Sequence, residues 1–236
     1  SASAIVGATD AILNTGGVAT VTVSGVATAA QGVAINEFTK DVAFEVDSSA
    51  DALATAISGD SALLDEAGSV TVTGGTVDVA DAAAIQGISG YVDSTASSYD
   101  IVDSASAIVG ATDAILNTGG VATVTVSGVA TAAQGADIDA FIQNVTYNVV
   151  DDANDIAAEL SGSNDQLDEA VSVTVTGGTV DVADAAAIQG ISGYVDSTAS
   201  SYDIVDSASA IVGATDAILN TGGVATVTVS GVATAA

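Results

Sequence analysis

Hydrophobic and polar residues alternate in short segments that recur along the chain. The segments VATVTVSG, DVAFEVD, SVTVTG and SYDIVD end at Gly25, Asp47, Gly74 and Asp103. Each segment is rich in β-branched or aromatic residues and is apolar at about every second position. This pattern predicts short β-strands with one buried face, about 25 residues apart.

An alanine-rich stretch with helical spacing follows each predicted strand. After Asp103, the residues Ile108, Ala111 and Ile115 are spaced so that they share one face of a predicted helix. Asp103 or Ser104 is a good N-cap, because its side-chain oxygen can accept the free N–H groups of the first turn. The chain therefore alternates between a strand and a capped helix.

A longer repeat contains these strand–helix units. The sequence SASAIVGATDAILNTGGVATVTVSG begins at Ser1, Ser104 and Ser207 without change. Residues 1–103 form repeat 1, residues 104–206 form repeat 2, and residues 207–236 begin repeat 3. Repeats 1 and 2 differ only between residues 33–68 and the equivalent window 136–171, where apolar positions stay apolar and polar positions vary. This pattern is typical of a core face under packing constraint.

A strand–helix unit of about 25 residues is too small to bury its own apolar face, and stacking on neighbouring units solves the problem. We therefore expect an α/β fold, a repetitive α/β solenoid in which parallel strands form one continuous sheet and alanine-rich helices pack along it. A string of compact α/β domains of 103 residues is the alternative. The sequence leaves open whether one strand–helix unit or a pair of them makes one turn.

The charge of the chain excludes several classes of partner. The 236 residues include 30 Asp and Glu but a single basic residue, Lys40, for a formal charge of −29. Nucleic acids and anionic membrane surfaces need a basic face, so neither is an expected partner. The sequence also has no run of 18 apolar residues, so we expect no membrane insertion. Mutual repulsion between the carboxylates favours surroundings with salt or divalent cations.

Catalysis is not expected. The chain has no Cys or His, and a single Lys, so no evident base could activate its many serines. Pairs of carboxylates could support glycoside hydrolysis. However, the pair Asp100 and Asp103 recurs as Asp203 and Asp206, and identical pairs on a regular repeat indicate structure.

Calcium is the one candidate ligand, and no cofactor is strictly required. Calcium prefers six to eight oxygen ligands, and several aspartates are close together in the sequence. The alternative is that these aspartates cap helices or face solvent. The candidate metal ligands are Asp78, Asp81, Asp100, Asp103, Asp203 and Asp206.

Segments such as YDIVDSASAIV, FEVDSSADALATAI and VTVTGGTVDVADAAAI give the chain a family resemblance. They resemble repeats of giant bacterial extracellular proteins, the adhesin-like and surface-filament proteins of cyanobacteria and marine proteobacteria. The resemblance implies secretion or display on the cell surface, great length, and a role in coats, adhesion, motility or matrix. It implies no enzymatic site.

The sequence therefore favours one function and leaves a second as the alternative. The first is a structural repeat module of a secreted or cell-surface filament, coat or matrix protein, with neighbouring repeats or further copies of the chain as partners. The second is a calcium-dependent adhesin stalk that presents a binding domain located elsewhere. The chain ends at Ala236 inside a predicted helix, which favours a slice of a longer array.

Overall fold

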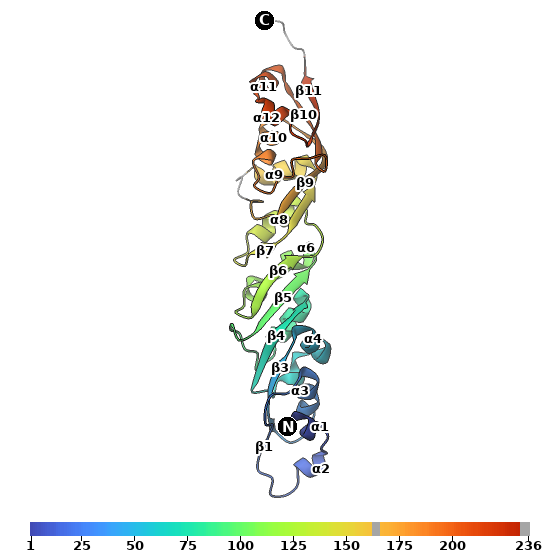
Figure 1. Ribbon diagram of the computed structural model, residues 1–236, viewed down its shortest axis with the longest axis vertical. Helices are drawn as coiled ribbons and strands as arrows, with labels where there is room; N and C mark the ends of the chain where they lie inside the picture. The colour runs from blue at the N-terminus through green and yellow to red at the C-terminus, as the bar shows by residue number, and fades with distance from the viewer. Residues whose placement is uncertain (162–165, 232–236) are drawn as a thin grey trace. The chain divides into compact units, whose positions relative to one another are not determined.

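The computed structural model describes residues 1–161 and 166–231, and these divide into two compact units. The first unit contains residues 1–103 and 111–125, and the second contains residues 104–110 and the chain from 126 onward. Figure 1 shows the elements of both units coloured along the chain. The last part of repeat 3, residues 232–236, lies outside the described residues.

Strands and helices alternate along the first unit, as the hydrophobic pattern predicts. Its elements are α1 (Ala2–Val6), α2 (Asp10–Leu13), β1 (Val21–Thr22), α3 (Ala29–Asn36), β2 (Val42–Ala43), β3 (Glu45–Ser48), α4 (Ala50–Ile57), the 3₁₀ helix η1 (Ser61–Leu64), β4 (Ser69–Val77), α5 (Val79–Gln86), β5 (Ser98–Asp103), α7 (Asp113–Leu116) and most of β6 (Val121–Val126).

From its second helix to β10, the second unit follows the order that α3 to β5 have in the first, without a 3₁₀ helix in the described residues. Its elements are α6 (Ala105–Gly110), α8 (Ala132–Asp139), β7 (Val145–Thr146), β8 (Asn148–Asp151), α9 (Ala153–Leu160), β9 (Ser172–Val180), α10 (Val182–Gln189), β10 (Ser201–Ser207), α11 (Ala208–Gly213), α12 (Asp216–Leu219) and β11 (Val224–Ser230).

The expected α/β class with parallel sheets is confirmed. In the second unit, β8, β9, β10 and β11 are neighbours in chain order, and every pair is parallel. In the first unit, β3, β4, β5 and β6 are also neighbours in chain order. Val46 lies beside Val70, and Val149 lies beside Val173. Each strand–helix unit therefore adds one strand to its sheet.

Helices pack against one another and against the strands beside them. In the first unit α4 contacts α3, α5 and β4, and in the second α9 contacts α8, α10 and β9. Figure 1 shows α3 and α4 beside β3 and β4 in the first unit, and α9 beside β9 in the second. The core between them consists mainly of aliphatic side chains. Its fully buried members include Val46, Leu53, Ile57, Leu64, Val70 and Ile85 in the first unit and Val149, Ile156, Leu167, Val173 and Ile188 in the second.

A single continuous sheet is not what the described residues form, because the strands divide into separate sheets of two, five and four strands. One interruption lies at Gly25, whose positive φ of 81° turns the chain out of the strand direction after β1. The chain returns at Ala27, which pairs with Val46 as an isolated parallel bridge. Gly128 has a φ of 94°, and Ala130 pairs with Val149 in the same way. A glycine turn within the repeat therefore breaks the ladder.

The predicted helix carrying Ile108, Ala111 and Ile115 on one face is wrong. The first helix, α6, ends at Gly110, and α7 begins only at Asp113. Between them Thr112 is extended, with φ −110° and ψ 152°, so the helical face does not continue. Glycine is unfavourable inside a helix, so Gly110 is the physical reason why the helix ends there. Leu116 is fully buried in α7, whereas Ile115 is only half-buried.

Candidate functional site

The predicted ligands Asp78 and Asp81 lie at the start of helix α5. Asp78 is the N-cap residue, and its Oδ1 accepts the backbone N–H of Asp81 at 2.8 Å. Partial burial and the neighbouring charge of Asp78 raise the pKa of Asp81. One carboxylate of this pair therefore satisfies a helix N–H group that would otherwise lack a partner.

Asp103 comes to the same helix N-terminus from strand β5. Its Oδ2 accepts the N–H of Val79, the first residue of α5, at 3.1 Å. Asp100, three residues earlier in β5, has a different partner, because its Oδ1 accepts the hydroxyl of Thr123 at 2.6 Å. The structure thus brings Asp78 and Asp103 to one helix N-terminus, while Asp100 bonds to the neighbouring segment.

The predicted ligands Asp203 and Asp206 follow the same pattern in the second unit. The Oδ2 of Asp206 accepts the N–H of Val182 at 3.2 Å, and its Oδ1 accepts the N–H of Ser207 at 2.6 Å. These two backbone donors lower the pKa of Asp206. Asp203 accepts the hydroxyl of Thr226 at 2.5 Å.

The candidate set omitted the matching pair at the start of α10. Asp181 caps this helix, and its Oδ1 accepts the N–H of Asp184 at 2.9 Å. Burial and the charge of Asp181 raise the pKa of Asp184. The 103-residue repeat is the sequence signal that identifies both residues, since they are the counterparts of Asp78 and Asp81.

A carboxylate from one strand–helix unit therefore caps the helix of the preceding unit. Asp103 does so at α5 and Asp206 does so at α10. Asp151 is a third example, because its Oδ2 accepts the N–H of Ala132, the first residue of α8, at 2.9 Å. A negative charge at a helix N-terminus interacts favourably with the helix dipole. These aspartates join consecutive strand–helix units through charge-assisted hydrogen bonds.

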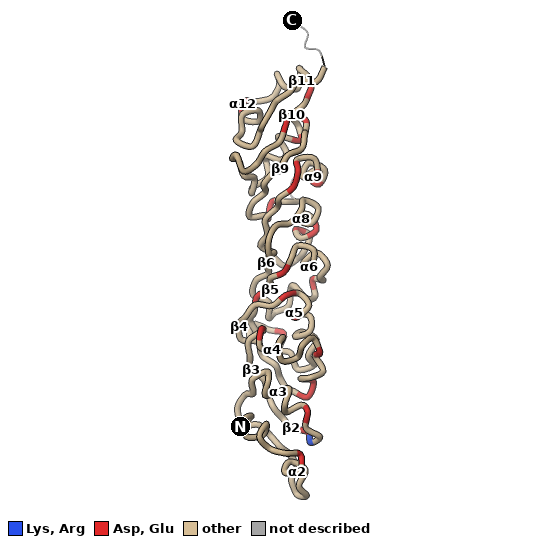
Figure 2. Tube along the Cα trace, turned by 90° about the vertical axis from the view of Figure 1, so that its right-hand side faces the viewer, with Lys and Arg blue, Asp and Glu red and all other residues tan. Residues whose placement is uncertain are grey.

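No group of three or more acidic side chains in the described part of the chain is arranged to hold a metal ion. Calcium needs six to eight oxygen ligands, and here single carboxylates face backbone N–H groups and threonine hydroxyls. Figure 2 shows the acidic residues distributed along both units, with the one lysine close to β2. The described geometry is that of helix capping along a repeat.

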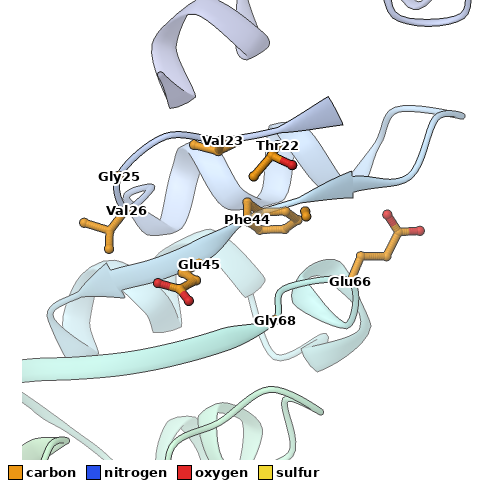
Figure 3. A pocket seen from close by; sticks show the side chains of 9 residues that line it. Thr22, Val23, Gly25, Val26, Phe44, Glu45, Glu66 and Gly68 are labelled. Carbon is orange, nitrogen blue, oxygen red and sulfur yellow. The ribbon is translucent and has the colours of Figure 1, made fainter. Parts of the chain in front are cut away.

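A surface pocket of about 450 Å³ lies in the first unit between β1, β2 and the loop before β4. Figure 3 shows Glu45 and Glu66 at its edge and the ring of Phe44 between them. Phe44 is 3% exposed and so belongs to the core. In repeat 2 the position of Glu45 is Asn148, so the acidic pair is not repeated. The acidic lining of this hollow is therefore a feature of repeat 1.

A more acidic cluster surrounds Tyr147 in the second unit. The hydroxyl of Tyr147 lies 3.5 Å from Oδ1 of Asp139. Burial, followed by the negative charges of Glu169 and Asp168, raises the pKa of Asp139. The equivalent residue in the first unit is Asn36, which accepts the N–H of Glu66 at 3.1 Å. The second repeat therefore carries a carboxylate at a position that an amide occupies in the first.

No family model, curated protein or solved structure matches the chain. Within the described residues, no helix has the length and apolar character required to cross a membrane.

Proposed function

We propose that the chain is a structural repeat module of a secreted or cell-surface bacterial filament, coat or matrix protein, built as an α/β solenoid. The observation that carries this proposal is the strand order. Within each unit, parallel strands follow one another in chain order, and helices pack alongside. A further repeat would extend such a sheet without closing it, so copy number sets the length.

The differences between the two repeats support a structural role. Phe44 and Tyr147 occupy the same position, and both are buried. Leu53 and Ile156, a second equivalent pair, are fully buried on α4 and α9. Polar positions change freely, for example from Lys40 to Gln143. The repeat preserves its packing surfaces and lets the rest of its surface vary.

The acidic composition supports an extracellular setting. With 30 carboxylates and one basic side chain, the chain repels other copies of itself unless salt screens the charges. Some of these carboxylates cap helices, so their charge also stabilises the repeat. A long polymer of such repeats would present a repulsive, soluble surface.

Chains with one to four copies of the 103-residue repeat test this proposal. For a solenoid, small-angle X-ray scattering should give a maximum dimension that grows by a constant step with each repeat. The denaturant dependence of the unfolding free energy should also grow, because coupled repeats unfold together. A maximum dimension that stays constant would contradict the proposal. Growth in length with an unchanged denaturant dependence would instead identify a string of independent domains.

A calcium-dependent adhesin stalk is the alternative function. Its test is thermal unfolding, followed by circular dichroism, with millimolar calcium and then with excess chelator. If the chain has ordered calcium sites, removing calcium with the chelator should lower the melting temperature, and monovalent salt of equal ionic strength should not restore it. A melting temperature that follows ionic strength alone would favour the structural module, because it would leave the aspartates as caps and surface charges.

A further inference from the structure

Residues 144–146 form the tripeptide Asn-Val-Thr, which is an acceptor sequence for N-linked glycosylation and occurs once in the chain. Asn144 is the last residue of the loop that follows helix α8, and Val145 and Thr146 form strand β7. The structural role proposed above does not use this tripeptide. Its surroundings in the fold decide whether it can serve as an acceptor.

The two residues that define the acceptor sequence both face solvent. Asn144 and Thr146 are exposed, whereas Val145 between them is 2% exposed and belongs to the core. This alternation is that of an extended backbone, in which successive side chains point to opposite sides. The side-chain amide and the hydroxyl two residues later therefore lie together on the outer side of the segment.

The side-chain amide of Asn144 has no structural role in the described part of the chain, since it makes no hydrogen bond there. Other asparagines differ. Asn36 accepts the N–H of Glu66, Asn148 accepts the hydroxyl of Ser172, and Asn154 accepts the N–H of Thr179; these bonds measure 3.1, 2.7 and 2.9 Å. A modification of Asn144 would break no such contact.

The loop itself is accessible. Residues 140–144 lie outside any helix or strand, and β7 contains only two residues. Segments of this kind open locally at a lower free-energy cost than the longer strands of a sheet. An enzyme can therefore engage this segment while the rest of the unit stays folded.

The first repeat shows that the fold does not require the acceptor sequence. The counterparts of Asn144 and Thr146 are Asp41 and Ala43, which are also exposed and also flank a buried valine, Val42. The same local structure thus forms with neither residue of the acceptor pair. Packing does not explain why repeat 2 carries both.

A second difference between the repeats lies in the same loop. Ile142 is 77% exposed, and its counterpart in repeat 1 is Thr39. A glycan on Asn144, two residues away, is bulky and hydrophilic and would shield this apolar side chain from other molecules. The second repeat therefore combines an exposed isoleucine with an acceptor sequence, and the first repeat has neither.

We propose that Asn144 is an acceptor site for an N-linked glycan. The inference rests on the proposed secreted or cell-surface role, since that is the setting in which such glycans are displayed. The donor is a sugar activated as a glycosyl diphosphate, carried either by a lipid or by a nucleotide. Nδ2 of Asn144 forms a bond to the anomeric carbon of the sugar while the bond from that carbon to the diphosphate oxygen breaks. The diphosphate leaves with the electron pair, and Nδ2 loses one proton to a base of the transferring enzyme.

Glycosyl transfer to the folded full chain tests this site. The chain is incubated with a purified oligosaccharyltransferase and a synthetic lipid-linked oligosaccharide, or with a soluble N-glycosyltransferase and a nucleotide-activated hexose. Both enzymes should be ones that require only Asn-x-Thr. Intact mass spectrometry should show one added glycan, and its mass identifies the donor. Asn144→Gln and Thr146→Ala should each abolish the addition, and both chains should stay folded by circular dichroism, because both positions are exposed.

Two further variants test whether the surroundings matter. Val150→Thr creates a second acceptor sequence at Asn148 in strand β8, where the asparagine is half-buried and bonded to Ser172. It should gain no second glycan while the chain is folded. Asp41→Asn combined with Ala43→Thr creates the sequence at the equivalent loop of repeat 1, and should gain a second glycan.

The proposal is overturned if the folded natural chain gains no glycan from either donor. It is also overturned if Asn148 in the Val150→Thr chain is modified as fast as Asn144, or if the paired substitution in repeat 1 gains nothing, because the loop would then not determine the acceptor. None of these results affects the structural module, which is tested by the growth of length with repeat number. Conversely, a length that does not grow would overturn the structural module even if Asn144 were glycosylated.

Discussion

The 25-residue sequence that occurs as residues 1–25, 104–128 and 207–231 is called the shared segment, and its first and last copies have different structures. In the first unit the strand it forms, β1, contains only Val21 and Thr22. In the second unit the same sequence forms β11, which runs for seven residues from Val224 to Ser230. Identical local propensities cannot explain the difference, so its cause lies in the neighbours.

The neighbour that extends the strand is the one that precedes it. Strand β10 pairs with β11 at six positions, whereas β1 pairs with β2 at two. The glycines respond as well. Gly17 has a φ of 108°, while its counterpart Gly223 is buried against the hydroxyl of Tyr194 and does not have a positive φ. Pairing with the preceding strand, β10, thus gives the last copy of the shared segment its strand geometry.

The neighbour that buries the valines is the one that follows. Val23 is covered in the first unit, where α3 and β2 follow the segment, and Val229 is exposed in the second. Strand formation and side-chain burial are therefore supplied from opposite sides. This division is the physical content of nearest-neighbour coupling in a repeat protein.

The largest expected effect comes from removing the side chain that anchors β10. Tyr202 is 1% exposed, its hydroxyl accepts a hydrogen bond from Gln189 at 2.6 Å, and its N–H donates to Gly223. Tyr202→Ala should lower the unfolding free energy of the second unit by about 3–5 kcal/mol. Hydrogen exchange in β11 should accelerate strongly.

The matched control is Tyr99→Ala, which makes the same change in the first unit. It should leave the exchange of β11 unaltered. If β11 kept its protection in the Tyr202→Ala chain, the strand would not depend on β10, and the explanation of its length would be wrong.

The second expected effect concerns the helix that covers the first shared segment. A Cβ on Gly32 of α3 would lie 2.8 Å from side-chain methyl carbons of both Leu64 and Val46, so these buried side chains would have to shift. Gly32→Ala should cost about 1–3 kcal/mol through overpacking, measured by urea unfolding. Gly213→Ala is the control, since a Cβ there meets nothing within 4 Å. Equal stability of the two variants would show that α3 can shift freely.

Much of this fold follows from hydrophobic periodicity. The alternating segments ending at Asp47 and Asp103 are strands, and Leu53 and Ile57 are buried on the helix that follows the first of them. The sequence pattern did not reveal the interruption at Gly25, because a glycine at the end of an apolar run equally indicates the end of a strand. Only the pairing of Ala27 with Val46 shows that the chain returns to the sheet.

The sequence identified the candidate aspartates and two possible roles for them, calcium ligand or helix cap, but it did not identify their partners. Asp100 and Asp103 are three residues apart on one predicted strand, and this proximity in the sequence made both candidate ligands for one ion. In the structure Asp103 caps the helix of the preceding unit at Val79, and Asp100 bonds to Thr123. Contacts of this kind join residues more than 20 positions apart, so sequence proximity cannot identify them.

A third prediction tests burial within the identical sequence directly. Val23→Thr replaces a buried methyl group by a hydroxyl that has no hydrogen-bond partner. It should lower the free energy of unfolding by about 1–2 kcal/mol. Val229→Thr makes the same change where the side chain is 41% exposed, and should change stability by less than about 0.5 kcal/mol. Thermal unfolding of both variants provides the comparison. Equal losses would mean that the two valines have equivalent surroundings.

The smallest expected effect separates the two repeats by pH. The pKa of Asp139 is raised in the folded state by burial and by the charges of Glu169 and Asp168. Its protonated form is therefore favoured by folding, so its contribution to stability is present at low pH and is lost as pH rises through the folded-state pKa.

Asp139→Asn, which introduces the amide found at Asn36, should raise stability at pH 7 by about 0.5 kcal/mol and make it less dependent on pH between about 4 and 7. The reciprocal Asn36→Asp should lower stability at pH 7 and add a pH dependence to the first unit, where the N–H of Glu66 and the carbonyl of Ala62 now bond the amide. Urea unfolding across this pH range measures both. An Asp139→Asn chain with the pH dependence of the natural sequence would mean that the carboxylate is already solvated, and that the acidic surroundings of Tyr147 do not distinguish the second repeat from the first.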